Sequence, residues 1–288
     1  MNMNKPLLLL ITILLSANLF SQVKKQIEFD TAYGDNKEVG KYVELNGANI
    51  YYEEYGEGEP LLIIHANSGN IESMANQIDY FKSKYRVIAA DNRGHGKSEL
   101  NTDSLTYEQI ESDWHELVKH LELDSVNIVG WSDGGILGLK MAISGKTNIK
   151  KLVTMGANLR PDTTAVRAWA VREINKMRQM VNLALQMGDT SVNWELQKQL
   201  MGLLLDQPNI PTSDLKKIEA KTLIMAGDED IIKNSHTVEI YENIPNAHLC
   251  IMPGETHYTP FNSPKLFNLL VNDFLESPFK RPNSNWTK

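Results

Sequence analysis

The chain of 288 residues lacks several features that define other classes of protein. It has one cysteine, Cys250, so no disulfide can form within it. It also lacks a basic excess, because 29 Lys and Arg residues stand against 36 Asp and Glu residues and leave a formal net charge of −7. Binding to nucleic acid relies on Lys and Arg neutralising phosphates. The balance therefore argues against a nucleic-acid partner and leaves a small neutral or cationic substrate open.

The chain also lacks a long apolar run. The apolar stretch at residues 7–15 is too short for a comfortable transmembrane helix. It follows Lys5 and precedes the short segment 16–21, which is the three-part layout of a secretory signal peptide. We therefore expect residues 1–21 to be removed and residues 22–288 to form one exported domain, periplasmic or secreted, with no stable membrane anchor. An uncleaved anchor is the alternative.

Short apolar runs alternate with helix-like stretches along the rest of the chain. Unbroken apolar runs are typical of strands that a parallel sheet buries on both faces. Asn46-Gly47 between two alternating runs predicts a hairpin. The expected strands cover 61–64, 85–90, 126–130, 152–155, 222–226 and 249–252, and the expected helices cover 71–82, 107–121, 135–144, 235–241 and 264–275. This alternation predicts an α/β fold with a doubly wound, mostly parallel sheet. Cys250 is expected in its core.

One segment interrupts the alternation. Residues 163–187 and 191–205 are helical in composition, and no strand-like run occurs between about 160 and 212. We interpret this insertion as a helical cap over the site. Its methionines and tryptophans, such as Met201 and Trp194, could line an adaptable apolar pocket or simply attach the cap to the body.

The segment Gly130-Trp131-Ser132-Asp133-Gly134 is the strongest chemical signal. It follows the apolar run 126–129 and opens the helix-like run 136–142. A G-x-S-x-G pattern in this setting predicts a nucleophile elbow, in which a strained turn between strand and helix exposes the serine hydroxyl. The pattern alone occurs by chance, so Ser132 also needs a base and an orienting carboxylate.

Both partners follow late strands in the order that this architecture requires, which is serine, acid, histidine. The run 222–226 leads into Gly227-Asp228-Glu229-Asp230, and the run 249–252 leads to His257. Catalysis further needs two backbone N–H groups that stabilise the oxyanion. We expect these from Asp133, directly after the nucleophile, and from Asn67 in the loop after the strand 61–64.

These motifs resemble those of α/β-hydrolases over nearly all of the expected mature chain. The run Asp91–Ser98 and the loop led by His65 also match, although this chain has His65-Ala66 where the family usually has His-Gly. In the family the acid is the third residue after the glycine at the strand end, which maps onto Asp230. The resemblance implies an α/β-hydrolase fold and a cofactor-free, metal-free serine hydrolase that acts on small-molecule carboxylic esters.

A narrower resemblance concerns residues 130–135 and Gly156-Ala157-Asn158, which are similar to the valacyclovir hydrolase, or biphenyl hydrolase-like, group. Those enzymes cleave esters of α-amino acids, and the resemblance implies that Asp133 binds the ammonium group of the substrate. The alternative is that Asp133 only stabilises the start of its helix.

Other polar residues are interpreted structurally. Asp91 and Arg93 are expected to fix a loop near the site. His115 and His120 are five positions apart on a helix and do not share a face, so they and the nearby Asp113 are expected on a solvated surface rather than at a metal. The motifs leave amides, lactones, thioesters, carbon–carbon bonds and perhydrolysis open, and a non-catalytic binding protein is the hypothesis from another class. They do not indicate the oligomeric state.

Overall fold

A computed structural model describes residues 29–282, and the predicted signal peptide lies outside this range. All strands and helices belong to the compact unit that begins at Thr31. The strands are β1 (Lys41–Leu45), β2 (Ala48–Tyr55), β3 (Glu59–Ile64), β4 (Tyr85–Ala90), β5 (Val126–Trp131), β6 (Ile149–Met155), β7 (Lys221–Gly227) and β8 (Ala247–Met252). The helices are η1 (Ile71–Met74), α2 (Ala75–Phe81), α3 (Tyr107–His120), α4 (Asp133–Ser144), α5 (Ala168–Gln186), α6 (Trp194–Leu205), η2 (Thr212–Lys217), α7 (Asn234–Asn243), α8 (Thr259–Asn262) and α9 (Pro264–Glu276).

The strands form one eight-stranded sheet in the order β1-β2-β4-β3-β5-β6-β7-β8. The strands from β4 to β8 in this order are parallel, while β2 pairs antiparallel with β1 and β4. Asn46 and Gly47 both have positive φ in the predicted hairpin between β1 and β2, as this type of turn requires. The fold is therefore the predicted α/β fold with a mostly parallel sheet.

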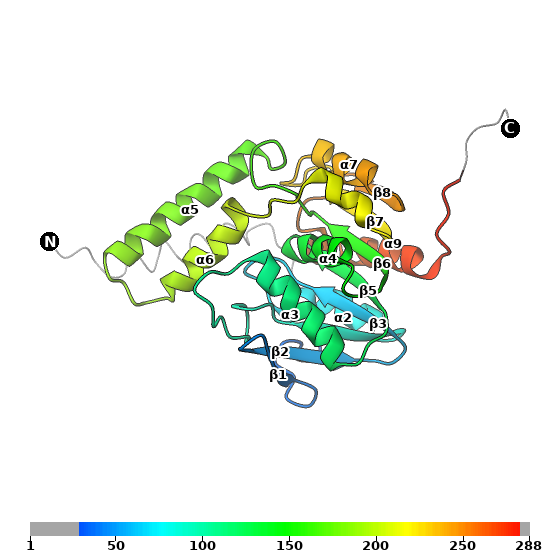
Figure 1. Ribbon diagram of the computed structural model, residues 1–288, viewed down its shortest axis with the longest axis horizontal. Helices are drawn as coiled ribbons and strands as arrows, with labels where there is room; N and C mark the ends of the chain where they lie inside the picture. The colour runs from blue at the N-terminus through cyan, green and yellow to red at the C-terminus, as the bar shows by residue number, and fades with distance from the viewer. Residues whose placement is uncertain (1–28, 283–288) are drawn as a thin grey trace. The chain divides into compact units, whose positions relative to one another are not determined.

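Helices cover both faces of the sheet (Figure 1). The helices α3, α4 and α7 form one layer together with η2, and α2 packs with α8 and α9 in the other layer. The central strands are buried as their unbroken apolar runs predict, since every residue of β5 is buried. None of the helices between residues 29 and 282 is long and apolar enough to cross a membrane.

The helices α5 and α6 lie between β6 and β7 in the chain and pack against each other. The helix expected at 163–187 begins only at Ala168, because Val166 forms a β-bridge with Ile232 and Arg167 is extended. Cys250 is only partly buried, contrary to the expectation of a core position, because β8 is an edge strand of the sheet.

Candidate active site

Ser132 lies in the turn that joins β5 to α4. Its φ of 54° and ψ of −114° are unfavourable for a residue with a side chain, as expected for a nucleophile elbow. Its backbone N–H donates to the Met155 carbonyl at 2.7 Å, which ties the turn to the end of β6. The sheet therefore holds the serine in a conformation that it would not adopt alone.

The glycines of the elbow allow close approaches of the backbone. A Cβ added to Gly134 would lie 2.1 Å from the Ile64 carbonyl oxygen, and one added to Gly130 would lie 2.1 Å from the Gly134 carbonyl oxygen. Heavy atoms cannot approach to this distance without bonding. The two glycines therefore let α4 begin directly against the end of β3.

The side chains of Ser132, His257 and Asp230 form a hydrogen-bonded path. The buried Asp230 carboxylate accepts from His257 Nδ1–H at 2.7 Å and from the Ile232 N–H at 2.9 Å, both through Oδ1. His257 Nε2 lies 2.9 Å from Ser132 Oγ. With the proton on Nδ1, Nε2 is free to accept the serine hydroxyl proton.

The neighbouring acid has another partner. The Asp228 carboxylate accepts from the Gly254 N–H at 2.8 Å and braces the turn after β7 against the turn after β8. Of the two aspartates considered from the sequence, the structure brings Asp230 to His257. The indole N–H of Trp131 donates to the His257 carbonyl at 2.7 Å, which links the elbow to the histidine loop.

His65 fixes the loop after β3. The Asn92 N–H donates to His65 Nε2 at 2.9 Å, so the proton resides on Nδ1, which donates to the Ala66 carbonyl at 2.7 Å. Burial, together with the nearby His95, lowers the pKa of His65 to about 3. A neutral His65 thus shapes the loop with Ala66 in place of the family's usual glycine.

The two expected oxyanion donors are backbone N–H groups of the loop after β3 and of the elbow. Within residues 29–282, neither the Asn67 N–H nor the Asp133 N–H donates to a protein acceptor. The Asn67 group belongs to the loop that His65 fixes, and the Asp133 group belongs to the first residue of α4. Free N–H groups at a helix start favour negative charge.

Asp133 is a buried carboxylate directly after the serine, with 3% of its surface exposed. Burial raises its pKa to about 6, although the Asn67 amide donates to Oδ2 at 3.0 Å and favours the charged form. The buried Tyr107 hydroxyl lies next to the carboxylate without the geometry of a hydrogen bond, and burial with this negative charge raises the pKa of Tyr107. The ionised form of Asp133 is therefore favoured at pH 7, by a smaller margin than for an exposed aspartate.

The Asn67 amide also donates to the Leu200 carbonyl of α6 at 3.3 Å. One side chain thus joins the loop after β3, the elbow and the inserted helices. The motifs predict a role only for the backbone of Asn67, and Tyr107 and Leu200 belong to no motif that would single them out.

Comparisons with known proteins agree with this geometry. A family model described as the alpha/beta hydrolase fold matches residues 59–201, which include the elbow. The chain has the α/β-hydrolase fold. Asp230 and His257 lie beyond the matched segment, so their assignment rests on order and geometry.

Named relatives of this hydrolase extend the match. It is 26% identical over 249 residues to "Serine hydrolase BPHL" of Mus musculus, covering 81% of this chain and 85% of that protein. It is 23% identical over 252 residues to the pimeloyl-[acyl-carrier protein] methyl ester esterase of Legionella pneumophila (strain Corby), covering 79% of this chain and all 100% of that protein. Among solved structures, bromoperoxidase from Bacillus anthracis matches with a TM-score of 0.70 and 25% identity over 83% of this chain and 100% of that chain.

The run Asp91–Ser98 of this hydrolase contains two buried charged residues that hold neighbouring loops in place. The buried guanidinium of Arg93 binds both carboxylate oxygens of Asp113, at 2.7 and 2.8 Å. The Asp91 carboxylate accepts the N–H groups of Ile71 and Lys97, at 2.8 and 2.7 Å, and burial raises its pKa to about 6. Asp91 and Arg93 thus fix loops as expected, whereas the expectation of a solvated Asp113 is wrong because the carboxylate pairs with Arg93.

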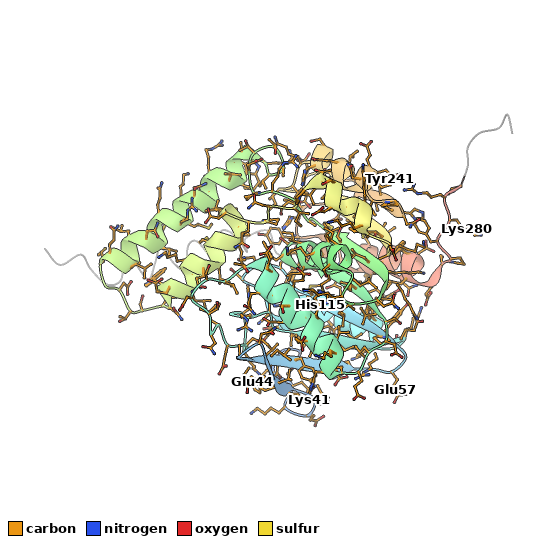
Figure 2. The ribbon with its side chains drawn as sticks, viewed as in Figure 1. Lys41, Glu44, Glu57, His115, Tyr241 and Lys280 are labelled. Atoms are coloured by element: carbon orange, nitrogen blue, oxygen red, sulfur yellow. The ribbon has the colours of Figure 1, made fainter. Side chains whose placement is uncertain are left out.

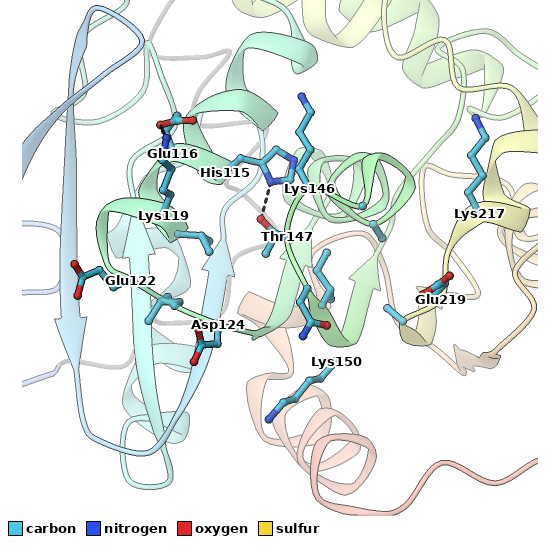
Figure 3. Close-up of a pocket in the computed structure, with 17 residues that line it drawn as sticks. His115, Glu116, Lys119, Glu122, Asp124, Lys146, Thr147, Lys150, Lys217 and Glu219 are labelled. Carbon is cyan, nitrogen blue, oxygen red and sulfur yellow. Dashed lines mark hydrogen bonds and ion pairs between the residues drawn. The ribbon is translucent and has the colours of Figure 1, made fainter.

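His115 is also buried rather than solvated. The residue, labelled in Figure 2, lies 2.7 Å from Thr147 Oγ1 through Nδ1 and 3.2 Å from Glu111 Oε1 through Nε2. It lines a groove of about 1080 Å³ at the amino ends of β5, β6 and β7 (Figure 3), which contains none of the residues of the serine path. Several lysines of this groove are paired with carboxylates, among them Lys119 with Glu116 and Lys217 with Asp214.

Proposed function

We propose that this hydrolase cleaves small carboxylic esters through an acyl-enzyme, with Ser132 as nucleophile, His257 as base and Asp230 as the orienting acid. The hydrogen-bonded path from Ser132 Oγ through His257 to Asp230 Oδ1 carries the proposal. A serine hydroxyl is a poor nucleophile at neutral pH, and this arrangement supplies the base that it needs. The Legionella esterase among its relatives favours esters.

The reaction follows from the placement of these groups. Ser132 Oγ attacks the ester carbonyl while His257 Nε2 takes the hydroxyl proton. The N–H groups of Asn67 and Asp133 stabilise the oxyanion of the tetrahedral intermediate. His257 then gives the proton to the leaving alcohol, and in the second half-reaction it activates a water that releases the acid. Amides, lactones, thioesters, carbon–carbon bonds and perhydrolysis would use the same groups, and the fold does not choose among them.

We further propose that Asp133 selects substrates with an ammonium group next to the scissile carbonyl, as in esters of α-amino acids. The carboxylate is adjacent to the nucleophile, buried, and mostly ionised at pH 7, so it would attract a cation and reject a bulky apolar acyl chain. The similarity to the mouse serine hydrolase BPHL supports the serine chemistry, and the ammonium site rests on the carboxylate alone. A role in stabilising the start of α4 does not need a buried ion.

A fluorophosphonate probe tests the nucleophile. We expect one covalent adduct on Ser132 of the folded protein, located by peptide mass spectrometry, and no adduct in Ser132→Ala. The exposed Ser191 provides a control, since Ser191→Ala should label like the wild type. An unlabelled, folded wild-type protein would remove the hydrolase proposal and favour a binding protein on this scaffold.

The role of Asp133 is tested with a pair of esters that differ only in an ammonium group. Asp133→Asn should lower the preference for the cationic ester by about 10- to 100-fold, the equivalent of one charged hydrogen bond. In the wild type the preference should fall as the pH drops through about 6, because protonated Asp133 is neutral. The control Glu195→Gln makes the same charge change at an exposed position of α6. An unchanged preference in Asp133→Asn would refute the ammonium site.

We also propose that the enzyme is exported and that residues 1–21 are its signal peptide. The charged start, short apolar core and small residues of this segment support the proposal. N-terminal sequencing of the protein recovered from the periplasm or medium should begin near residue 22. Recovery of the intact N-terminus in the cytoplasm would contradict it.

A further inference from the structure

The segment in front of α5 is attached to the turn that carries Asp230. Val166 and Ile232 form an isolated antiparallel bridge. The Arg167 N–H donates to the Ile231 carbonyl, and the Lys233 N–H donates to the Ala165 carbonyl, both at 2.8 Å. The side chains of Ala165, Val166, Ala170 and Ile232 form a small buried cluster of their own. The beginning of the inserted helices is therefore attached to the acid turn by backbone and side-chain contacts.

The guanidinium of Arg167 adds a second connection at the same place. Its Nε–H donates to the Asp230 carbonyl at 2.6 Å, and its Nη2–H donates to the Asp228 carbonyl at 3.1 Å. The Glu229 carboxylate lies 3.7 Å from Nη2. Hydrogen bonds from a charged donor are stronger than neutral ones, and the planar guanidinium fixes the directions of its two N–H groups together. Arg167 thus grips the backbone on both sides of Glu229.

The backbone that Arg167 binds includes Asp230, the acid of the proposed catalytic path. The Asp230 carbonyl that Arg167 binds and the carboxylate that binds His257 belong to one residue. The Ile232 N–H, which pins Asp230 Oδ1 at 2.9 Å, belongs to the residue bridged to Val166. A shift of the turn would lengthen the bond to His257 directly.

We propose that Arg167 is a positioning residue for the hydrolytic reaction: it holds the turn 228–230 so that Asp230 keeps His257 in its reactive orientation, and it links that orientation to the start of α5. This inference rests on the proposed function. Lysine cannot replace the residue fully, because a single ammonium group cannot reproduce the two fixed N–H directions of the guanidinium.

The test compares Arg167→Gln and Arg167→Lys with Arg172→Gln, a matched control at an exposed position of α5, the helix that Arg167 precedes. With a small neutral ester, kcat of Arg167→Gln should fall about 10- to 100-fold with little change in KM, as expected when a reacting group is misplaced. Arg167→Lys should be intermediate, and Arg172→Gln should match the wild type. Phosphonylation by the fluorophosphonate should slow in the same order, and thermal melts establish that each variant is folded.

A double-mutant cycle of Arg167→Gln with Asp230→Asn distinguishes the positioning of Asp230 by Arg167 from a general loss of structure. If Arg167 acts through Asp230, Arg167→Gln should lower the residual rate much less in the Asp230→Asn background than in the wild type. An equal loss in both backgrounds, a loss confined to KM, or a rate equal to that of Arg172→Gln would overturn the proposal. If Arg167→Gln does not fold, full activity of a folded Arg167→Lys overturns it. A wild-type protein without turnover or labelling would instead remove the proposed function itself.

Discussion

Acid should destabilise this hydrolase through His65. In the folded protein the Asn92 N–H donates to His65 Nε2, so a proton on that nitrogen would break the bond and place a charge in a buried position. Burial accordingly lowers the pKa of His65 from 6.5 to about 3. The unfolded chain takes up this proton near its ordinary pKa, well before the folded chain does.

The size of the effect follows from the two pKa values. Because the folded pKa is the lower one, the stabilisation is complete above pH 6.5 and is lost as the pH falls toward 3. Each pH unit in this interval removes about 1.4 kcal/mol, so His65 alone should cost about 2 kcal/mol at pH 5. Asp91 and Asp133 act in the opposite direction, since their raised pKa values favour proton uptake by the folded state below about 6.

Urea unfolding at pH 7.5 and at pH 5 gives the change in the free energy of unfolding, and the contribution of His65 is the difference in this change between the wild type and His65→Gln. His65→Gln should lower stability at pH 7.5 because it loses hydrogen bonds, yet its stability should fall by about 2 kcal/mol less than that of the wild type on going to pH 5. The aspartates contribute equally to both proteins and cancel. His120→Gln, at an exposed position of α3, should retain the wild-type pH dependence. Equal pH dependences for His65→Gln and the wild type would refute the reasoning.

Two further substitutions probe buried contacts. Asp113→Asn leaves the guanidinium of Arg93, 1% exposed, without its carboxylate and should cost about 3–5 kcal/mol in urea unfolding; a loss below about 1 kcal/mol would mean that the carbonyl acceptors of Arg93 suffice. Gly156→Ala places a Cβ 2.7 Å from His257 Nδ1 at a position with φ of +66°, so ester turnover should fall about 100-fold while stability falls by only about 1–2 kcal/mol. Normal turnover by Gly156→Ala would show that His257 has room to move.

The sequence predicted what local patterns and chain order encode. The elbow around Ser132 combines a strand, a turn that needs glycine and a helix, and each leaves a mark in neighbouring residues. Asp230 and His257 could be predicted because the architecture places them after particular strands. The buried central strands were equally visible, since burial on both faces requires unbroken apolar runs.

Contacts between segments far apart in the sequence have no local pattern that would predict them. Arg167 precedes an ordinary helix, and its two acceptors are backbone carbonyls that any residue provides. Asp113 and His115 looked solvated because their helix is mixed in polarity, and only the tertiary partners Arg93 and Thr147 explain their burial. A polar residue on a helix is buried when a partner satisfies it, which the spacing of one helix cannot reveal.

The large sequence separation between Ser132 and His257 affects when the protein becomes active during folding. Ser132 and His257 are 125 positions apart, and His257 follows β8, an edge strand of the sheet. Contacts of such high sequence separation form slowly because long loops must close first. The elbow can be complete once β5, β6 and α4 have assembled, yet the serine gains its base only when the C-terminal part of the chain docks. The onset of ester turnover during refolding should therefore report the docking of β8, later than probes near Trp131 report the central sheet.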